Sequence, residues 1–352
     1  MSLQSPFNDI CILRLSAIGD VCHAVSAVQA IQQHYPNAKI TWVVGKIEAM
    51  LLADLPGVEL VVFDKKQGKA AYHSLKQHFK GRKFDVLLHM QVALRANLAA
   101  RVIPAKVKVG FDWHRAKEGH FLFTSHRIAA EKEAHVLEGF RGFAKAIGVP
   151  HYEPSWQMPV SQEDHDFAAQ ILSPLGDKIL VLSPAASKAE RNWLPERYAE
   201  VADYATRQGF SVVITGGPTE LEVTLAKQIE NAMSSKALNL VGKTNLKQLL
   251  CVLEKASLVI APDTGPAHMA VTMATPVIGL YAHSNPARTG PYLYQDYVVE
   301  VYHQNLKQQT GKTAKQLPWG TRVKGKELMQ QISVESVKQM FDRVVKERLC
   351  NG

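Results

Sequence analysis

The segment 261–268, Ala-Pro-Asp-Thr-Gly-Pro-Ala-His, combines residue types that can bind an anion beside a carboxylate and an imidazole. It follows three apolar residues that predict a buried strand, and it precedes an apolar stretch that can continue as a helix. Gly265 permits a tight turn, and Pro266 suits the first helical position, where no amide donor is needed. Free amides and the dipole at a helix start favour an anion such as a diphosphate, with Asp263 and His268 near enough to contact a sugar or phosphate. A well-made turn with a hydrogen-bonded histidine is the alternative.

A second loop, residues 16–20, follows the apolar run 10–15 and leads into a helical pattern. Asp20 stands near the start of that helix, where Asp is a favoured capping residue. The functional interpretation is a general base that projects into a ligand cleft. No GxGxxG pattern accompanies the loop, which argues against a dinucleotide-dependent redox enzyme.

The elements that must position these loops alternate along the chain between strand-like and helix-like patterns. Strands are expected at residues 10–15, 40–44, 60–63, 86–88, 106–111, 179–182, 211–215, 238–241, 258–260 and 276–281. Strands separated by helices predict an α/β fold with parallel sheets and right-handed crossovers. Two such blocks predict two doubly wound domains, which bind ligands at the carboxyl ends of their strands.

Four prolines between residues 150 and 174 mark the expected linker. We therefore expect an N-terminal domain over residues 1–160 and a C-terminal domain over residues 175–330. Residues 331–352 should form an amphipathic helix that can pack back on the N-terminal domain. The polar residues 304–326 predict a surface loop.

Composition restricts the class of protein. The chain has 352 residues, 46% hydrophobic and 21% charged, and no apolar run approaches the roughly 18–20 residues that cross a bilayer. The first six residues lack a signal-peptide pattern, and the four cysteines form no CxxC pair, which favours a cytoplasmic protein with reduced thiols. They are Cys11, Cys22, Cys251 and Cys350.

The charge is strongly basic, at +9, and it is uneven. Residues 60–120 hold thirteen Lys or Arg and four Asp or Glu, which favours an anionic partner such as nucleic acid, an anionic lipid or a phosphorylated glycan. No nucleic-acid-binding motif accompanies the charge, so nucleic acid ranks last. A solvated basic face is the alternative without a partner.

Together with two further elements, these loops resemble the ADP-heptose:lipopolysaccharide heptosyltransferases, a bacterial glycosyltransferase family with the GT-B fold. The resemblance covers nearly the whole chain. Its strongest parts are 15–20, Leu-Ser-Ala-Ile-Gly-Asp, and 263–268, Asp-Thr-Gly-Pro-Ala-His. Between them, 191–195, Arg-Asn-Trp-Leu-Pro, and 216–220, Gly-Gly-Pro-Thr-Glu, look like two more family elements. The resemblance implies two Rossmann-like domains that face each other across a cleft.

The resemblance also implies roles for individual residues. Asp20 would take the proton of the acceptor hydroxyl. Donor contacts would come from Ser187, Arg191, Glu220, Gly242, Lys243, Thr244, Asp263, Thr264, Gly265 and His268. In the family pattern Arg191 and the 264–265 turn hold the diphosphate, Glu220 holds the ribose, and 242–244 lie near the adenine. Family members often carry Lys at the position of Arg191. The alternative to a donor contact for Arg191 is a surface salt bridge.

The stretch 110–113, Gly-Phe-Asp-Trp, with Lys117 and Glu118, looks like heptosyltransferase I enzymes, which add the first heptose to Kdo on lipid A. The helix with His135 and Arg141 is also similar. Haemophilus-type members of this branch use phosphorylated Kdo, which the basic N-terminal half fits. The expected acceptor contacts are Ser16, Gly19, Arg95, Arg115 and Lys117.

The implied reaction is inverting transfer from ADP-heptose to Kdo-lipid A at the cytoplasmic face of the inner membrane, with no cofactor and no metal. The D-x-D segment 164–166 should start a helix and not bind Mg²⁺. Three alternatives stay open: transfer to a later inner-core heptose, use of a UDP-sugar, and a catalytically silent protein that binds a nucleotide or an anionic lipid.

Overall fold

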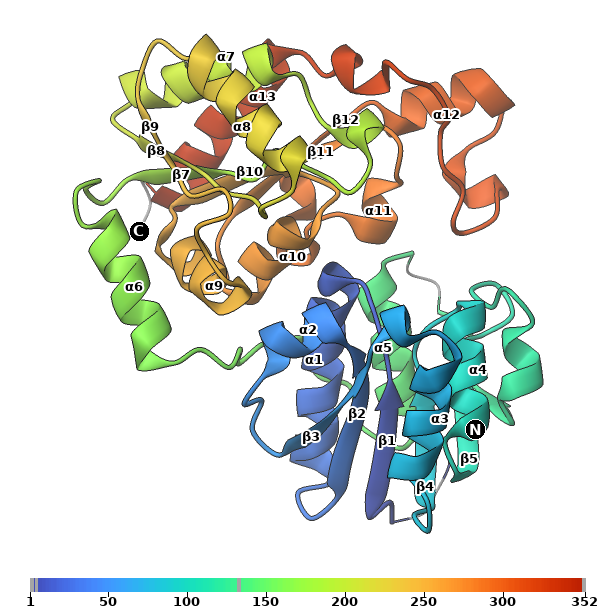
Figure 1. Ribbon diagram of the computed structural model, residues 1–352. Helices are drawn as coiled ribbons and strands as arrows, with labels where there is room; N and C mark the ends of the chain where they lie inside the picture. Colours follow the sequence, from blue (N-terminus) through green and yellow to red (C-terminus); the bar gives the residue numbers. More distant parts are fainter. Residues whose placement is uncertain (1–2, 4–5, 132–133, 350–352) are drawn as a thin grey trace. The chain divides into compact units, whose positions relative to one another are not determined.

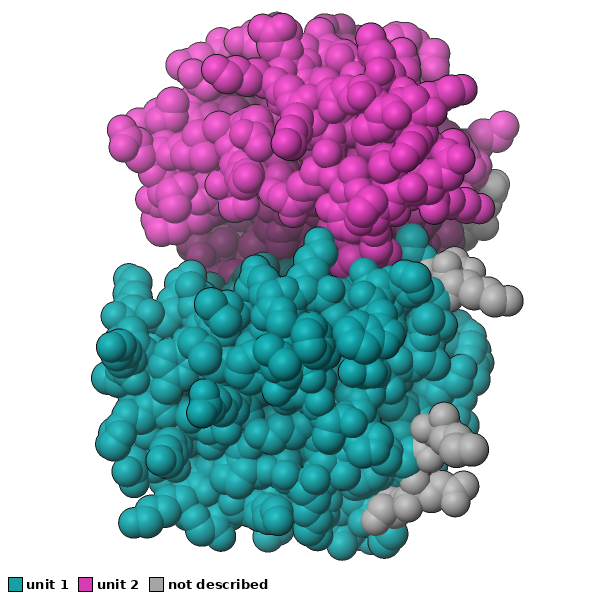
Figure 2. Space-filling view, turned by 90° about the vertical axis from the view of Figure 1, so that its right-hand side faces the viewer, with its two compact units in different colours: residues 1–159 teal, residues 160–352 magenta. Residues whose placement is uncertain are grey.

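The computed structural model describes residues 3, 6–131 and 134–349. The chain divides into two compact units, Met1–Pro159 and Val160–Gly352, which Figure 2 draws in separate colours. Each unit contains one six-stranded sheet in which every neighbouring pair of strands runs parallel, so the expected α/β fold with two doubly wound sheets is confirmed. Cys350 lies outside the described residues, and so do four of the first six residues.

The first sheet has the strand order β3-β2-β1-β4-β5-β6. Its strands are β1 (Asp9–Leu13), β2 (Lys39–Gly45), β3 (Val58–Phe63), β4 (Phe84–His89), β5 (Ala105–Gly110) and β6 (His126–Arg127). In this order the chain reverses its direction of travel across the sheet between β1 and β4. Ligands of doubly wound sheets bind at the carboxyl ends of the strands beside that switch point.

Both faces of the first sheet are covered, which explains why its central strands are apolar without alternation. One core cluster, with Ile10, Ile12 and Trp42, packs under α1 (Ile18–His34) and α5 (Val136–Ala146). The other cluster packs under α3 (Lys69–His78) and α4 (Leu94–Val102) (Figure 1). The shorter elements are α2 (Lys46–Leu52), η1 (Lys65–Gln67) and η2 (His120–Phe123).

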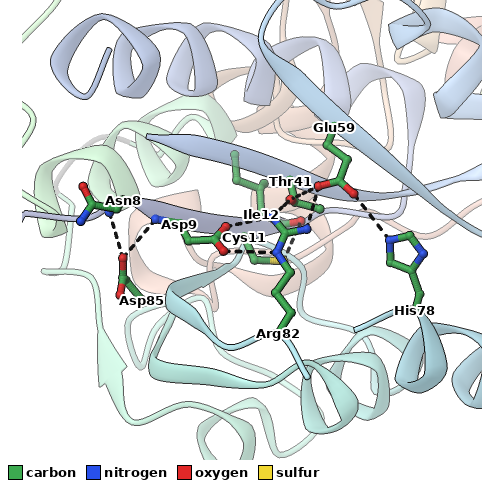
Figure 3. A network of polar contacts seen from close by, with 9 residues as sticks. All are labelled: Asn8, Asp9, Cys11, Ile12, Thr41, Glu59, His78, Arg82 and Asp85. Carbon is green, nitrogen blue, oxygen red and sulfur yellow. Dashed lines mark hydrogen bonds and ion pairs between the residues drawn. The ribbon is translucent and has the colours of Figure 1, made fainter. Parts of the chain in front are cut away.

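At the amino end of the first sheet, a polar network ties four strands together (Figure 3). The Arg82 guanidinium donates to both carboxylate oxygens of Asp9, to Glu59 at 2.7 Å and to Thr41 at 2.8 Å. The Asp85 carboxylate accepts the amides of Asn8 and Asp9 at 2.8 and 3.0 Å. These bonds join the starts of β1, β2, β3 and β4, so this end of the sheet is fixed by internal contacts.

The second sheet has the strand order β12-β11-β10-β7-β8-β9, which repeats the topology of the first. Its strands are β7 (Ile179–Leu182), β8 (Ser211–Ile214), β9 (Ala237–Asn239), β10 (Leu258–Pro262), β11 (Val277–Tyr281) and β12 (Val298–Glu300). The equivalent switch point lies between β7 and β10. The loops that follow these two strands therefore define the expected ligand position in this unit.

Helices also cover this second sheet (Figure 1). They are α6 (Gln162–Leu172), α7 (Pro195–Arg207), α8 (Glu220–Ala232), α9 (Leu246–Lys255), α10 (Gly265–Thr272), α11 (Pro286–Thr289), α12 (Tyr302–Thr310) and α13 (Val334–Val344). Four 3₁₀ turns and a π turn complete the unit: η3 (Ala189–Arg191), η4 (Tyr292–Tyr297), η5 (Ala314–Gln316), η6 (Leu328–Gln331) and η7 (Val345–Leu349). Helix α12 occupies part of the segment for which the sequence predicted a loop.

The C-terminal helix α13 packs within the second unit. Buried Phe341 meets Phe210 and Tyr204 edge-on, and Lys338 donates to Glu200 on α7 at 2.6 Å. The indole of Trp193, 1% exposed, donates to the Ile332 carbonyl at 3.0 Å. The amphipathic face of this helix thus packs on α7, β11 and β12 of its own unit, and packing of residues 331–352 on the N-terminal domain stays a prediction.

Candidate active site

Asp20 lies at the carboxyl end of β1, next to the switch point of the first sheet. It is the third residue of α1, and Ala17, not Asp20, is the N-cap. One carboxylate oxygen, Oδ2, accepts the Ala17 amide at 3.4 Å and forms an ion pair with Arg14. The Asp20 side chain stays 31% exposed, whereas that of Arg14 is 10% exposed. A carboxylate that reaches solvent while a buried cation orients it can accept a proton from a bound hydroxyl.

Arg14 is a candidate site residue that the sequence patterns did not single out. It donates to the Met90 carbonyl after β4 at 2.7 Å, so it connects the two strands of the switch point. Burial lowers the pKa of Arg14, and the charge of Asp20 opposes that effect. A lone arginine inside the apolar run 10–15 was the available signal, because charged residues are rarely buried without a partner.

The expected acceptor residues Ser16 and Gly19 lie in the same loop. Gln91 donates to the Ser16 hydroxyl at 3.3 Å and accepts the Leu15 amide at 2.7 Å. Gly19 is buried in the first turn of α1. The loops after β1 and β4 are therefore bonded to each other, which fixes the position of Asp20.

A buried cluster fixes the loop after β5 against α4. The Asn97 carbonyl oxygen lies 2.8 Å from His89 Nε2 and 3.1 Å from His120 Nδ1, and its amide nitrogen donates to the Glu118 carbonyl at 2.9 Å. His120 Nε2 accepts the Phe111 amide, so its proton must sit on Nδ1 and both rings are neutral donors to Asn97. Burial lowers the pKa of His120 to about 4 and that of His89 well below its usual range.

This cluster, which sequence reasoning also missed, presents the remaining acceptor candidates. Lys117 is exposed on the fixed loop, and Arg95 is exposed on the first turn of α4. Arg115 differs from both because its side chain is 4% exposed and pairs with Asp112 at 2.9 Å. The structure therefore places Arg115 as an internal ion pair that shapes the loop, and not as an open cation.

In the second unit, the residues 263–268 occupy the carboxyl end of β10 at its switch point, as the sequence pattern required. Asp263 Oδ1 lies 3.9 Å from His268 Nε2, and its Oδ2 lies 3.9 Å from Arg191. Burial alone would raise the pKa of Asp263, but the neighbouring His268 and the charge of Arg191 hold it below its usual value. The histidine thus lies beside a carboxylate, and it is not a core residue without polar neighbours.

Helix α10 begins at Gly265, with Pro266 in its first turn. Thr264 is the N-cap, yet its hydroxyl donates to the Ala185 carbonyl at 3.1 Å instead of to the helix. The Thr264 side chain therefore makes no capping hydrogen bond to α10. A helix start at the carboxyl edge of a parallel sheet is an arrangement that can bind phosphate.

Arg191 ends the turn η3 after β7, with its side chain 12% exposed. Burial lowers its pKa, and the charge of Arg322 acts in the same direction while Asp263 opposes both. Arg322 comes from the segment that the sequence predicted as a surface loop, and no sequence pattern singled it out. Arg191 and Arg322 are thus close enough for their charges to interact, and Ser187 is exposed on the loop that carries Arg191.

The remaining donor candidates follow β8 and β9. Glu220 is exposed at the first turn of α8, whereas its neighbour Glu222 accepts the Gly217 amide at 2.8 Å and holds the turn. Gly242 has a φ of +72° and donates to the Gly216 carbonyl at 2.9 Å, which joins this turn to the next. Lys243 donates to the Asn239 carbonyl at 2.8 Å. Thr244, which is partly buried, completes the segment.

Side chains that could coordinate a metal ion lie together outside the loops described above. In the D-x-D segment, Asp164 caps α6 together with Ser161, which accounts for it without a metal. Its neighbour His165 pairs with Glu254 at 3.3 Å, and these two with Cys251 bring three donor atoms within 4.8 Å of one another. That group lies between α6 and α9, outside the loops described above, and we assign it no step in the reaction.

Among the described residues, no helix combines the length and the apolar character that crossing a bilayer demands.

Comparisons with known proteins identify the family of the chain. The family model for glycosyltransferase family 9 (heptosyltransferase) matches residues 72–319. The lipopolysaccharide core heptosyltransferase OpsX of Haemophilus influenzae is 47% identical over 330 residues, which cover 94% of this chain and 95% of that protein.

Solved structures show the same fold. A family 9 glycosyl transferase from Veillonella parvula superposes with a TM-score of 0.78 at 21% identity, over 97% of this chain and 100% of that one. The E. coli heptosyltransferase WaaC with ADP gives 0.72 at 22% identity, over 96% of this chain and 99% of that one.

Proposed function

The chain belongs to glycosyltransferase family 9, the heptosyltransferases, and from that premise we propose that it transfers L-glycero-D-manno-heptose from ADP-heptose to Kdo of Kdo-lipid A. The product, Kdo-lipid A with one heptose on Kdo, is part of the inner core of lipopolysaccharide. The similarity to OpsX, a lipopolysaccharide core heptosyltransferase, supports the acceptor class. The observation that carries the reaction type is the orientation of Asp20 by Arg14 at the switch point of the first sheet.

The second unit binds the donor in this proposal. Arg191, Arg322, Ser187 and the amides at Thr264 and Gly265 hold the diphosphate, because cations and uncapped amides at a helix start complement its charge. Asp263 and His268 contact the heptose and the phosphates. Glu220 holds the ribose hydroxyls, and the segment 242–244 borders the adenine.

The first unit binds the acceptor. Ser16 and Gly19 contact it beside Asp20, while Arg95 and Lys117 bind its anionic groups. Arg115 supports the loop through Asp112. The basic surface of this unit fits an acceptor with several negative charges, including a Kdo that carries phosphate.

In the reaction, the acceptor oxygen attacks the anomeric carbon from the face opposite ADP, and its proton passes to the Asp20 carboxylate. The bond from that carbon to the phosphate oxygen breaks, ADP departs with the electron pair, and a β-linked donor gives an α-linked product. Arg191 and the α10 amides stabilise the charge that grows on ADP, as preorganised donors do. The mechanism uses no cofactor and no metal. The enzyme acts in the cytoplasm, as a peripheral protein on the inner face of the inner membrane.

Mass spectrometry of the products from ADP-heptose and Kdo-lipid A, with and without phosphate on Kdo, tests the proposal. We expect one heptose to be added to Kdo. Addition only to an acceptor that already carries heptose would instead assign the chain to a later step of the inner core.

Thermal unfolding in the presence of ADP or UDP tests the donor. ADP should raise the melting temperature more than UDP, because only the nucleotide that binds stabilises the fold. A larger shift with UDP would contradict the assignment.

A further inference from the structure

The loop after β5 and the turn η2 expose three large apolar side chains. Leu122 is 74% exposed, Trp113 is 61% and Phe121 is 44%, and Leu122 is the most exposed large apolar residue among the described residues. Single exposed apolar residues need no explanation, but a contiguous group of them indicates an interaction surface. We name these three side chains, together with Arg101, Lys106, Lys108 and Arg127, the apolar-basic patch.

Direct contacts hold the patch together. The rings of Trp113 and Phe121 lie 5.4 Å apart between centroids, and the Arg127 guanidinium stacks 3.9 Å above the Trp113 ring. Phe121 and Leu122 follow His120, which Asn97 anchors to α4. The apolar side chains are therefore presented on a fixed turn, and their exposure is not that of a loose loop.

Cations surround the apolar side chains. Leu122 and Phe123 share a cavity of about 590 Å³ with Arg101, Lys106 and Lys108. The Lys108 amine is partly buried and donates to the Ala100 carbonyl at 2.5 Å. Burial lowers the pKa of Lys108.

The acidic groups near the patch are already engaged. Asp85 pairs with Lys106 at 2.7 Å, and Glu118 accepts the Leu94 amide. Arg101 and Arg127 are both exposed. The four cations of the patch outnumber these two carboxylates, so the net charge of the patch is positive.

We propose that the apolar-basic patch docks this enzyme onto a bilayer that contains anionic phospholipids. The proposal rests on the proposed function only in that the acceptor is a membrane lipid. Surfaces that bind at the membrane interface typically combine tryptophan and other large apolar side chains with Arg and Lys. The rings and alkyl chains enter the headgroup layer, and the cations contact lipid phosphates. Lys117, a proposed acceptor contact, lies between Trp113 and Phe121 in the sequence, so docking brings the acceptor headgroup to its binding loop.

Co-sedimentation of the full-length protein with vesicles tests the docking. The vesicles contain phosphatidylethanolamine with or without phosphatidylglycerol. We expect binding only with phosphatidylglycerol, weakened by salt. The double variant Phe121→Ser/Leu122→Ser and the double variant Arg101→Gln/Arg127→Gln should each reduce binding by about tenfold.

The matched control changes exposed apolar residues of the other unit, in Leu221→Ser/Leu293→Ser, where the two side chains are 43% and 41% exposed. This control should bind like the unchanged protein. Equal binding by the patch variants and the control would overturn the proposal, as would a preference for vesicles without phosphatidylglycerol.

An assay with two acceptors separates docking from catalysis. The patch variants should transfer heptose to a deacylated, water-soluble Kdo acceptor at the unchanged rate, and should lose transfer to Kdo-lipid A embedded in vesicles. If the unchanged protein transfers to neither acceptor, the proposed function fails. If it transfers to both and the patch variants match it on vesicles, the docking proposal alone fails.

Discussion

An arginine–aspartate pair lies at each end of strand β1, and the two pairs differ in how many carboxylate oxygens of the aspartate are hydrogen-bonded. At the amino end, Arg82 donates to both oxygens of Asp9. At the carboxyl end, Arg14 and the Ala17 amide both contact Oδ2 of Asp20, so Oδ1 is the oxygen that can accept a proton. Proximity of an arginine to an aspartate therefore does not single out a candidate general base, and the availability of Oδ1 is what favours Asp20 in our proposal.

The pKa values of the two arginines are shifted in opposite directions, which agrees with this difference between the pairs. The hydrogen bonds to Asp9 raise the pKa of Arg82, whereas burial lowers the pKa of Arg14. Arg82 is partly exposed and saturated with acceptors, which is the signature of a structural pair. Arg14 is buried beside a carboxylate that solvent reaches. Burial of a cation costs stability, and charged groups with pKa values perturbed by burial are typical of functional sites.

The largest effect is expected from a substitution that breaks the Arg14–Asp20 pair at the carboxyl end of β1. Asp20→Asn should lower the rate of heptose transfer by about 10²–10⁴, because the amide cannot take the acceptor proton. Steady-state kinetics measure the loss, and calorimetry should show unchanged ADP binding, since Asp20 belongs to the first unit. Transfer at nearly the unchanged rate would remove Asp20 from catalysis.

A smaller effect is expected from substitution of Arg191, the cation of the second unit that we propose contacts the donor. Arg191→Gln should weaken ADP binding by about 10- to 100-fold, the value of a hydrogen bond to a charged group. Titration calorimetry with ADP measures it. Lys188→Gln, an exposed cation in the same loop, is the control and should change little. Similar losses in both variants would indicate diffuse attraction instead of a defined contact.

The amino-end pair should affect stability and not catalysis. Arg82→Gln should lower the free energy of unfolding by about 1–3 kcal/mol, because Asp9 and Glu59 lose a charged donor. Urea denaturation measures the change, and the transfer rate per folded molecule should stay unchanged. A lowered rate at full folding would make the two ends of β1 functionally alike.

Acid should weaken the first unit through His89 and His120. Both pKa values are lower in the folded protein, so the unfolded chain binds more protons below about pH 6.5. Stability is therefore retained above that pH and falls as the pH drops toward about 4, the pKa of His120. Urea midpoints from pH 7 to 4 measure it. His120→Gln should be less stable at pH 7 but should lose less on acidification, whereas exposed His114→Gln should follow the unchanged protein.

Chelation should have the smallest effect of all. EDTA should leave the transfer rate unchanged, because the proposed mechanism neutralises the departing diphosphate with Arg191 and backbone amides. Initial rates with and without EDTA measure it. Loss of activity that Mg²⁺ restores would show that these groups are insufficient.

The sequence predicted those parts of the molecule that depend on neighbouring residues. The turn at Gly265 and the helix that follows it depend on local backbone preferences, and both lie where they were expected. The apolar runs likewise marked both parallel sheets, because strands covered on two faces need no alternation.

The partners of these residues could not be predicted from spacing. Arg14 reaches Met90, and Asn97 joins His89 to His120, through contacts that only the folded sheet creates. Arg115 shows the converse case, since this basic residue in a basic stretch forms a buried ion pair with Asp112, and its contact with the acceptor stays a prediction. Type and spacing identify candidates, but burial and partners decide between a structural and a functional charge.

Rescue of the Asp20→Ala variant by formate tests directly whether the Asp20 carboxylate accepts the acceptor proton. Removing the carboxylate leaves the Arg14 guanidinium beside a vacated space that a small carboxylate can enter. We expect the variant to be nearly inactive, added formate to restore transfer in proportion to its concentration, and formate to leave the unchanged enzyme unaffected. Full activity of the variant without formate would show that Asp20 is not the general base.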